Sequence, residues 1–234
     1  MRSEFSVNLD SGTGAIPVLF RRHPRARHFK LRVDPDGRVI VTLPRGGSQA
    51  EALGFIEKHR SWIESERRER RAEPHGQVWR PGFEILFRGE QSVLTLERFH
   101  ARPFVRFGDQ RVAIADPDMD FKRPVCEHLR RLARQELPGR VVELSNRLGV
   151  SHARTSVRDQ STRWGSCSQA GTISLNWRLI QAPSEVSDYV IMHELMHRIE
   201  MNHSNRFWNL VAEACPEYRT YEDWLKEHAR KVGL

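Results

Sequence analysis

The sequence predicts an α+β fold, in which a small strand-rich N-terminal part precedes a helix-rich C-terminal part. Residues 29–44 and 83–115 alternate apolar and polar side chains around turn residues, as strands with one buried face do. Residues 122–148 instead repeat apolar side chains at a spacing near 3.6, which is typical of a helix. The spacing of apolar residues changes from alternating to helical at Asp116-Pro117-Asp118, so we predict a strand-rich part over 1–115 and a second domain over 116–234.

The N-terminal part begins with a predicted hairpin over residues 29–44, because residues 34–37 read Asp-Pro-Asp-Gly, a turn sequence. A helix is expected from about 48 to 71, since Ser48 and Glu51 have the spacing of a capping box. The apolar residues expected on its buried side are Leu53, Phe55, Ile56, Trp62 and Ile63. Strand pairs should follow over 83–98 and 103–115.

The C-terminal part should open with the helix over 122–148, kinked or split at Pro138-Gly139. Short strands are predicted at 155–160 and 171–180, because Ile173, Leu175 and Trp177 alternate in the second segment. An apolar helix after Pro183 and further helices after Ser204 complete this part.

Composition limits the class of protein. A hydrophobic fraction of 38% in 234 residues allows a packed core. The sequence contains no run of eighteen apolar residues, so no membrane-spanning helix is predicted. Three cysteines without paired spacing and the absence of an apolar signal segment favour a reducing, cytoplasmic location. The net charge of +8, concentrated in 21–32 and 66–76, predicts a solvated basic surface with nonspecific attraction for nucleic acid.

The segment HELMHRIEMNH, residues 193–203, carries the strongest functional signal. His193 and His197 are four residues apart, so a helix places both imidazoles on one face with Glu194 beside them. This is the spacing of two zinc ligands and a general base. A catalytic zinc needs a third protein ligand, and His203 can supply it if the chain turns at Asn202 in a left-handed conformation.

The competing interpretation is a helix with ordinary buried histidines. The flanking residues 189–192, 195, 196 and 199 are apolar nearly all round the helix, which predicts burial. Burying imidazoles without partners costs free energy, and a metal ion removes that cost. We therefore predict one zinc ion per chain, with Asp188 and Glu213 as candidate carboxylates to orient the ligands.

Two segments, RWGSCSQAGTISLNWRLIQAP (163–183) and DYVIMHELMHRIEMNHSNRFW (188–208), resemble the YgjP-like zinc metallopeptidases, a bacterial group related to the SprT-like proteases. The opening RARHFKLRVDPDGRVIVTLPRGGS (25–48) is also similar to that family. The resemblance implies a zincin-like catalytic domain, zinc held by His193, His197 and His203, and Glu194 as the base that acts on a zinc-activated water. A peptide or protein is the substrate that it favours.

The candidate substrate cleft comprises Arg163, Trp164, Gly165, Ser166, Cys167 and Asn176. Cys167 has three interpretations, which are a small buried side chain, a nucleophile and a further zinc ligand. Tyr218, Tyr221 and Arg163 are candidates to stabilise an oxyanion. Phe207 and Trp208 are expected to be core residues that fix His203, with a substrate pocket as the alternative.

Two other functions remain open at this point. Arg158, Arg163, Arg178 and Arg206 could bracket a polyphosphate, which would suit a zinc-dependent nucleotide pyrophosphatase acting on a substrate such as UTP. The basic N-terminal part could instead deliver a protease to nucleic acid, as in a repair protease.

Overall fold

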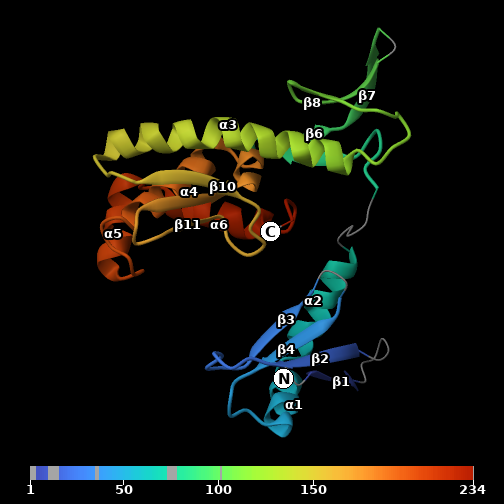
Figure 1. The fold of residues 1–234 in the computed structure, drawn as a ribbon, viewed down its shortest axis with the longest axis vertical. Coiled ribbons are helices and arrows are strands. Elements are labelled where there is room, and N and C mark those ends of the chain that lie inside the picture. Colours follow the sequence, from blue (N-terminus) through green and yellow to red (C-terminus); the bar gives the residue numbers. More distant parts are fainter. Residues whose placement is uncertain (1–3, 10–15, 35–36, 73–77, 101, 234) are drawn as a thin grey trace. The chain divides into compact units, whose positions relative to one another are not determined.

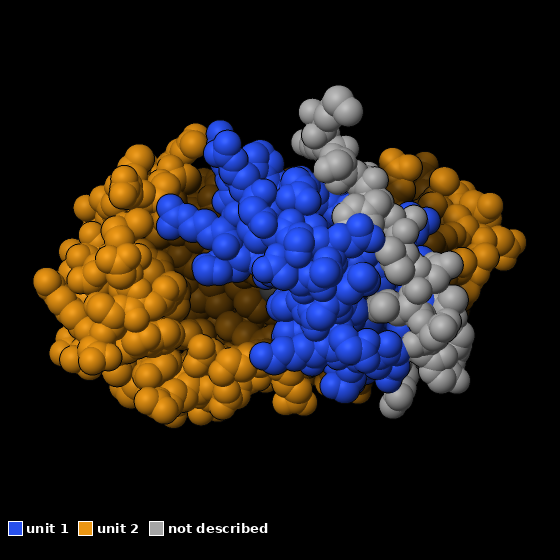
Figure 2. Space-filling view, turned by 90° about the horizontal axis from the view of Figure 1, so that it is seen from below, with its two compact units in different colours: residues 1–77 blue, residues 78–234 orange. Residues whose placement is uncertain are grey.

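The computed structural model describes residues 4–9, 16–34, 37–72, 78–100 and 102–233. The chain divides into two compact units, residues 1–77 and 78–234 (Figure 2). This division differs from the predicted boundary at 115 and 116. The strands between 84 and 113 bury side chains such as Phe87, Val105 and Phe107 in the same core as the C-terminal helices. A shared core, rather than a change in strand content, sets the boundary.

The first unit contains a four-stranded sheet in the order β1-β2-β4-β3, with β2 parallel to β4 and the other pairs antiparallel (Figure 1). Its elements are β1 (Glu4–Leu9), β2 (Ile16–Arg22), β3 (Lys30–Val33), β4 (Val39–Leu43), α1 (Gln49–Lys58) and α2 (Arg60–Ala72). The hairpin predicted over 29–44 is confirmed as β3 and β4, and residues 35 and 36 of its turn lie outside the described residues.

The predicted capping box is confirmed at the start of α1. The Ser48 hydroxyl accepts a hydrogen bond from the Glu51 amide at 3.2 Å, and the Ser48 amide donates to the Glu51 carboxylate at 2.8 Å. The helix does not run unbroken to 71, because the amide of His59 bonds to the carbonyl of Ile56 and tightens the turn between α1 and α2. Ile56 and Ile63 are buried as expected, but Trp62 is 44% exposed.

The second unit contains the remaining elements. They are β5 (Glu84–Phe87), β6 (Glu90–Val93), β7 (Thr95–Phe99), β8 (Arg102–Phe107), β9 (Gln110–Ala113), α3 (Lys122–Leu148), β10 (Arg154–Arg158), β11 (Gly165–Cys167), β12 (Thr172–Asn176), the 3-10 helix η1 (Trp177–Gln181), α4 (Ser184–Met196), α5 (Asn205–Ala214) and α6 (Tyr218–His228). The strand pairs expected over 83–98 and 103–115 form β5-β6 and β7-β8-β9.

Helix α3 runs along one side of this unit and is continuous through Pro138 (Figure 1). The expected split is therefore wrong. Proline inside a helix costs about 3 kcal/mol, whereas each fully buried aliphatic side chain contributes about 1.5–3 kcal/mol. One buried stripe extends on both sides of the proline, and its members are Val125, Leu129, Ala133, Leu137, Val141 and Leu144. Packing of that stripe outweighs the lost backbone hydrogen bond.

The site is positioned by a three-stranded sheet and α4. In this sheet β12 is central, parallel to β10 and antiparallel to β11, and α4 packs against β11 and β12. The order of long helix, short strands and ligand-bearing helix is the one expected of a zincin-like domain, and the α+β class is confirmed. Among the described residues, no helix combines the length and apolar character needed to cross a membrane.

Candidate metal centre

His193, His197 and His203 converge at the end of α4. The helix ends at Met196, and His193 and His197 lie one turn apart, as their spacing predicts. After it the chain turns through hydrogen bonds from the amides of Arg198 and Ile199 to the carbonyls three residues earlier. Asn202 does not adopt the expected left-handed conformation, because among the described non-glycine residues only Arg88 and His100 have positive φ. The 3-10-type bonds turn the chain instead.

The distances within this cluster suit a metal ion. The candidate ligand nitrogens of the three histidines all lie within 4.8 Å of one another. Nε2 of His193 and Nε2 of His203 are 3.1 Å apart. Nitrogen ligands about 2.0–2.1 Å from a tetrahedral zinc ion lie about 3.3 Å from each other, so the distance between His193 and His203 is close to that of two zinc ligands.

Hydrogen bonding and ring packing orient the imidazoles. Nδ1 of His197 lies 3.1 Å from the carbonyl oxygen of Glu200, so it carries the proton and leaves the Nε2 lone pair available. The ring of Phe207 is fully buried and stacks on His197 with centroids 4.3 Å apart. This confirms Phe207 as a core residue beside the site. Backbone and core packing, rather than the expected carboxylate of Asp188, orient the ligand, because Asp188 accepts a hydrogen bond from Arg140.

Burial keeps two of the imidazoles neutral. Burial, together with the neighbouring His197 and His203, lowers the pKa of His193 to about 3. Burial also lowers the pKa of His197. Neutral imidazole is the form that binds a metal. Nδ1 of His193 is buried without a hydrogen-bond partner among the described residues.

Glu194 lies beside the histidines and is almost enclosed. It is 6% exposed, and its Oε2 has no hydrogen-bond partner among the residues that the structure describes. Burial raises the pKa of Glu194 to about 8, and the charge of Arg163 opposes this shift. A buried carboxyl group with an unpaired oxygen next to three histidines fits a site that binds a cation.

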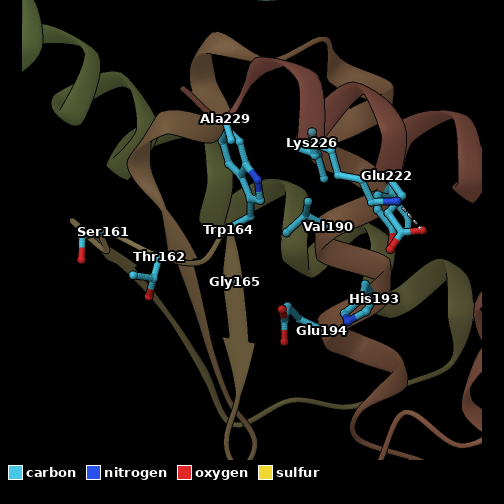
Figure 3. Close-up of a pocket in the computed structure, with 12 residues that line it drawn as sticks. Ser161, Thr162, Trp164, Gly165, Val190, His193, Glu194, Glu222, Lys226 and Ala229 are labelled. Atoms are coloured by element: carbon cyan, nitrogen blue, oxygen red, sulfur yellow. Dashed lines mark ion pairs between the residues drawn. The ribbon is translucent and has the colours of Figure 1, made fainter. Parts of the chain in front are cut away.

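Gly165 of β11 makes room for Glu194. A Cβ atom added at Gly165 would lie 2.6 Å from Oε1 of Glu194 and 2.8 Å from its Cγ. Figure 3 shows the Glu194 side chain between β11 and α4. The predicted cleft residue Gly165 therefore borders the candidate base directly.

The other predicted cleft residues have different surroundings. Trp164 lines a pocket beside His193 and Glu194, and Ser166 pairs with Ser174 of β12. Cys167 is outside the histidine cluster, and burial followed by the charge of Glu194 raises the pKa of its thiol. These observations favour the small half-buried side chain among the three interpretations of Cys167.

Asn176 does not line the pocket but holds one of its walls. Its side chain is fully buried, and its Nδ2 donates to the carbonyls of Gln160 at 2.8 Å and Arg163 at 3.0 Å. Of the three oxyanion candidates, only Arg163 influences Glu194 electrostatically. Tyr221 donates its hydroxyl to Glu217, and Tyr218 stacks on Trp208.

Sequence reasoning missed the wall of the pocket that α6 provides. Its members Glu222, Leu225, Lys226 and Ala229 follow the spacing of one helical face. That spacing could have grouped them, but nothing in the sequence shows which surface the face meets. Tyr189 and Val190 of α4 also line the pocket, and their apolar character predicted burial alone.

Two comparisons with known proteins found a match. The family model described as the YgjP-like, metallopeptidase domain matches residues 27–228. The crystal structure of the metallopeptidase zymogen of Pyrococcus abyssi abylysin is similar at 25% identity, over 37% of this chain and 89% of that chain, with a TM-score of 0.35. No curated protein matches the chain. Because the family model covers most of the sequence, the chain belongs to the YgjP-like family of metallopeptidase-domain proteins.

Proposed function

We propose that the chain is a zinc-dependent peptidase, in which His193, His197 and His203 hold one zinc ion and Glu194 is the general base. The observation that carries this proposal is the convergence of three imidazole nitrogens within 4.8 Å beside a buried carboxyl group. Three histidine nitrogens match the protein ligand set of a catalytic zinc site, which keeps its fourth position for water or substrate. Membership of a metallopeptidase family supports the same metal-dependent chemistry.

When bound there, zinc would lower the pKa of water and polarise the carbonyl of the scissile peptide. Glu194 would accept the proton of the attacking water and transfer it to the leaving amine nitrogen. The side chain of Glu194 packs directly against Gly165, where any Cβ atom would displace it. Arg163 is exposed near Glu194, where its charge would favour the carboxylate form and a developing oxyanion.

The edge of β11 supports a peptide as substrate. Among the described strands β11 pairs with β12 alone, so its other edge remains available to an extended backbone. The nucleotide alternative has less support, because Arg178 is already engaged. Its guanidinium donates to Asp159 at 2.6 Å and to the carbonyl of Val232 at 2.9 Å.

The test is hydrolysis of a mixture of unstructured peptides by zinc-loaded protein, followed by mass spectrometry. Glu194→Gln is the matched control, because it preserves the shape of the side chain and removes the base. We expect wild type to cleave and the variant to lose about 10²–10⁴-fold in rate. Equal rates for both proteins, or hydrolysis of UTP without cleavage of any peptide, would contradict the proposal.

A further inference from the structure

A pocket of about 550 Å³ opens directly beside the candidate catalytic pair, and His193 and Glu194 belong to its lining (Figure 3). Three segments wall it, namely residues 161–165, α4 and α6. Its volume lies in the range of about 300–1,000 Å³ that is common for sites that enclose small ligands. A group seated in the pocket would therefore sit within reach of Glu194.

The inner wall of the pocket is apolar. It consists of Trp164, Tyr189, Val190, Leu225 and Ala229. Tyr189, Val190 and Leu225 are buried members of the core, which supports this wall from behind. Burial raises the pKa of Tyr189, so its phenol stays neutral. A large apolar side chain would exchange water for this surface, which is favourable in proportion to the area covered.

Two charged residues of the lining, Glu222 and Lys226, have opposite charges and form an ion pair, and Lys226 also pairs with Asp223 outside the lining. Nζ of Lys226 lies 3.6 Å from the carboxylate of Glu222 and 3.0 Å from that of Asp223 (Figure 3 draws the first pair). The Lys226 side chain is 64% exposed, which places these charges near solvent. A basic or acidic occupant would meet a charge of its own sign as well as the opposite one. The charges therefore offer little preference for a charged side chain.

The wall opposite the two helices is held rigidly. The amide of Asn176 donates to the carbonyl of Trp164 at 2.8 Å, and the Asn176 side chain donates to the carbonyls of Gln160 and Arg163. Because Asn176 is fully buried, these bonds are shielded from water. A preformed wall avoids part of the ordering cost of binding.

We infer that this pocket binds a large apolar side chain, such as Phe or Leu, on the residue next to the scissile bond of a peptide. The inference rests on the proposed peptidase function, because it is the shared lining with Glu194 that places the scissile bond there. Selection occurs through apolar contact with Trp164 and Leu225. Ala229, the residue that follows α6, is a further small member of the lining.

The test compares peptides of one sequence that carry Phe, Leu, Ala, Lys or Glu on either side of the cleaved bond. For one of the two positions, we expect kcat/KM for Phe or Leu to exceed that for Ala by about tenfold or more. Lys and Glu should fall below Ala. Equal rates across the series, or Lys as the best residue at both positions, would overturn the inference while the peptidase function stands.

Ala229→Phe should fill the pocket without touching the histidines or Glu194. We expect it to reduce kcat/KM for the Phe peptide about tenfold or more and to leave the Ala peptide nearly unaffected. Glu227→Phe is the matched control, since Glu227 is exposed on the same helix and does not line the pocket. It should behave as wild type. An unchanged Phe preference in Ala229→Phe would overturn the assignment, and the peptide series tests it independently if that variant misfolds.

A binding measurement separates this inference from the proposed function. Calorimetry on the Glu194→Gln protein should show the Phe peptide binding about tenfold more tightly than the Ala peptide. If wild type cleaves no peptide but this difference persists and disappears in Glu194→Gln/Ala229→Phe, the pocket assignment stands and the peptidase function fails. Equal binding of both peptides without any cleavage would refute both.

Discussion

Gly165→Ala should separate catalysis from folding. The added Cβ would lie 2.6 Å from Oε1, 2.8 Å from Cγ and 3.0 Å from Cδ of Glu194. Ordinary carbon contacts lie at about 3.5–4.0 Å, so the carboxyl group must move by about 1 Å. Displacements of that size near the reacting atoms cost about a hundredfold in rate. We therefore expect kcat to fall about a hundredfold, with zinc content unchanged.

The fold should tolerate the same change, because the atoms that clash belong to one side chain and not to the backbone. The thermal midpoint should fall by only a few degrees, which corresponds to about 1 kcal/mol. Gly139→Ala is the matched control, since a Cβ there would meet nothing within 4 Å. Steady-state kinetics and thermal unfolding of both variants provide the comparison. Wild-type kcat in Gly165→Ala would refute the idea that the strand positions Glu194.

Three further changes test the surroundings of the site. Trp208→Ala removes a ring whose centroid lies 5.7 Å from that of His203, and it should weaken zinc binding about tenfold. Its cost in folding stability should stay below the roughly 3 kcal/mol of a fully buried aromatic residue. Zinc titration and denaturation measure the two effects, and an unchanged zinc affinity would refute the coupling between Trp208 and the metal site. Asn176→Ala should raise KM more than it lowers kcat, because the pocket wall loses its support. It should also lower the free energy of unfolding by about 1–3 kcal/mol, since two carbonyl groups lose their hydrogen-bond donor. An unchanged KM would contradict the role of Asn176 in the pocket wall. For Asp159, burial raises the pKa, but the hydrogen bonds to Arg178 and its neighbours, together with the charge of Arg178, outweigh burial and lower the pKa to about 2. Its stabilising effect should be complete above about pH 4 and be lost as the pH falls toward 2, by less than about 1 kcal/mol because the side chain is half exposed. Asp159→Asn should therefore flatten the stability curve in that range, and identical acid denaturation of variant and wild type would contradict the assignment.

Local chemistry explains what the sequence predicted well. The capping box at Ser48 and Glu51 involves atoms three residues apart, and the helix start follows directly from it. The common face of His193 and His197 likewise depends only on helical geometry, so their approach could be foreseen. His203 needed only a short turn to join them, although hydrogen bonds in that turn, and not Asn202, provide it.

Tertiary packing explains what the sequence missed. Pro138-Gly139 predicted a kink or a split, but the helix is continuous there, because the buried stripe of α3 packs on surfaces supplied by distant elements. Trp62 fits an apolar helical pattern and is nevertheless exposed, because periodicity does not show which face finds a partner. Strand β11 is three residues long, too short for an alternating pattern to reveal. The residues of α6 that line the pocket together with Trp164 are more than fifty positions away from it in the sequence.

The domain boundary illustrates the same limit. The strands after residue 83 show the same alternation of apolar and polar residues as those of the first unit, and this similarity favoured a division near residue 115. Ile85, Leu94 and Ile114 instead join the core of α3 and α4, so the chain divides at 77. Membership in a core is a property of the folded chain and has no local signature.

Elemental analysis of purified protein, wild type beside His203→Ala, tests the central claim most directly. His203 is exposed, so its removal should leave the fold intact and delete one of the three candidate ligands. We predict about one zinc per wild-type chain and a loss or marked weakening of binding in the variant. No zinc in the wild type after incubation with the metal at neutral pH, or equal zinc in both proteins, would contradict the three-histidine site.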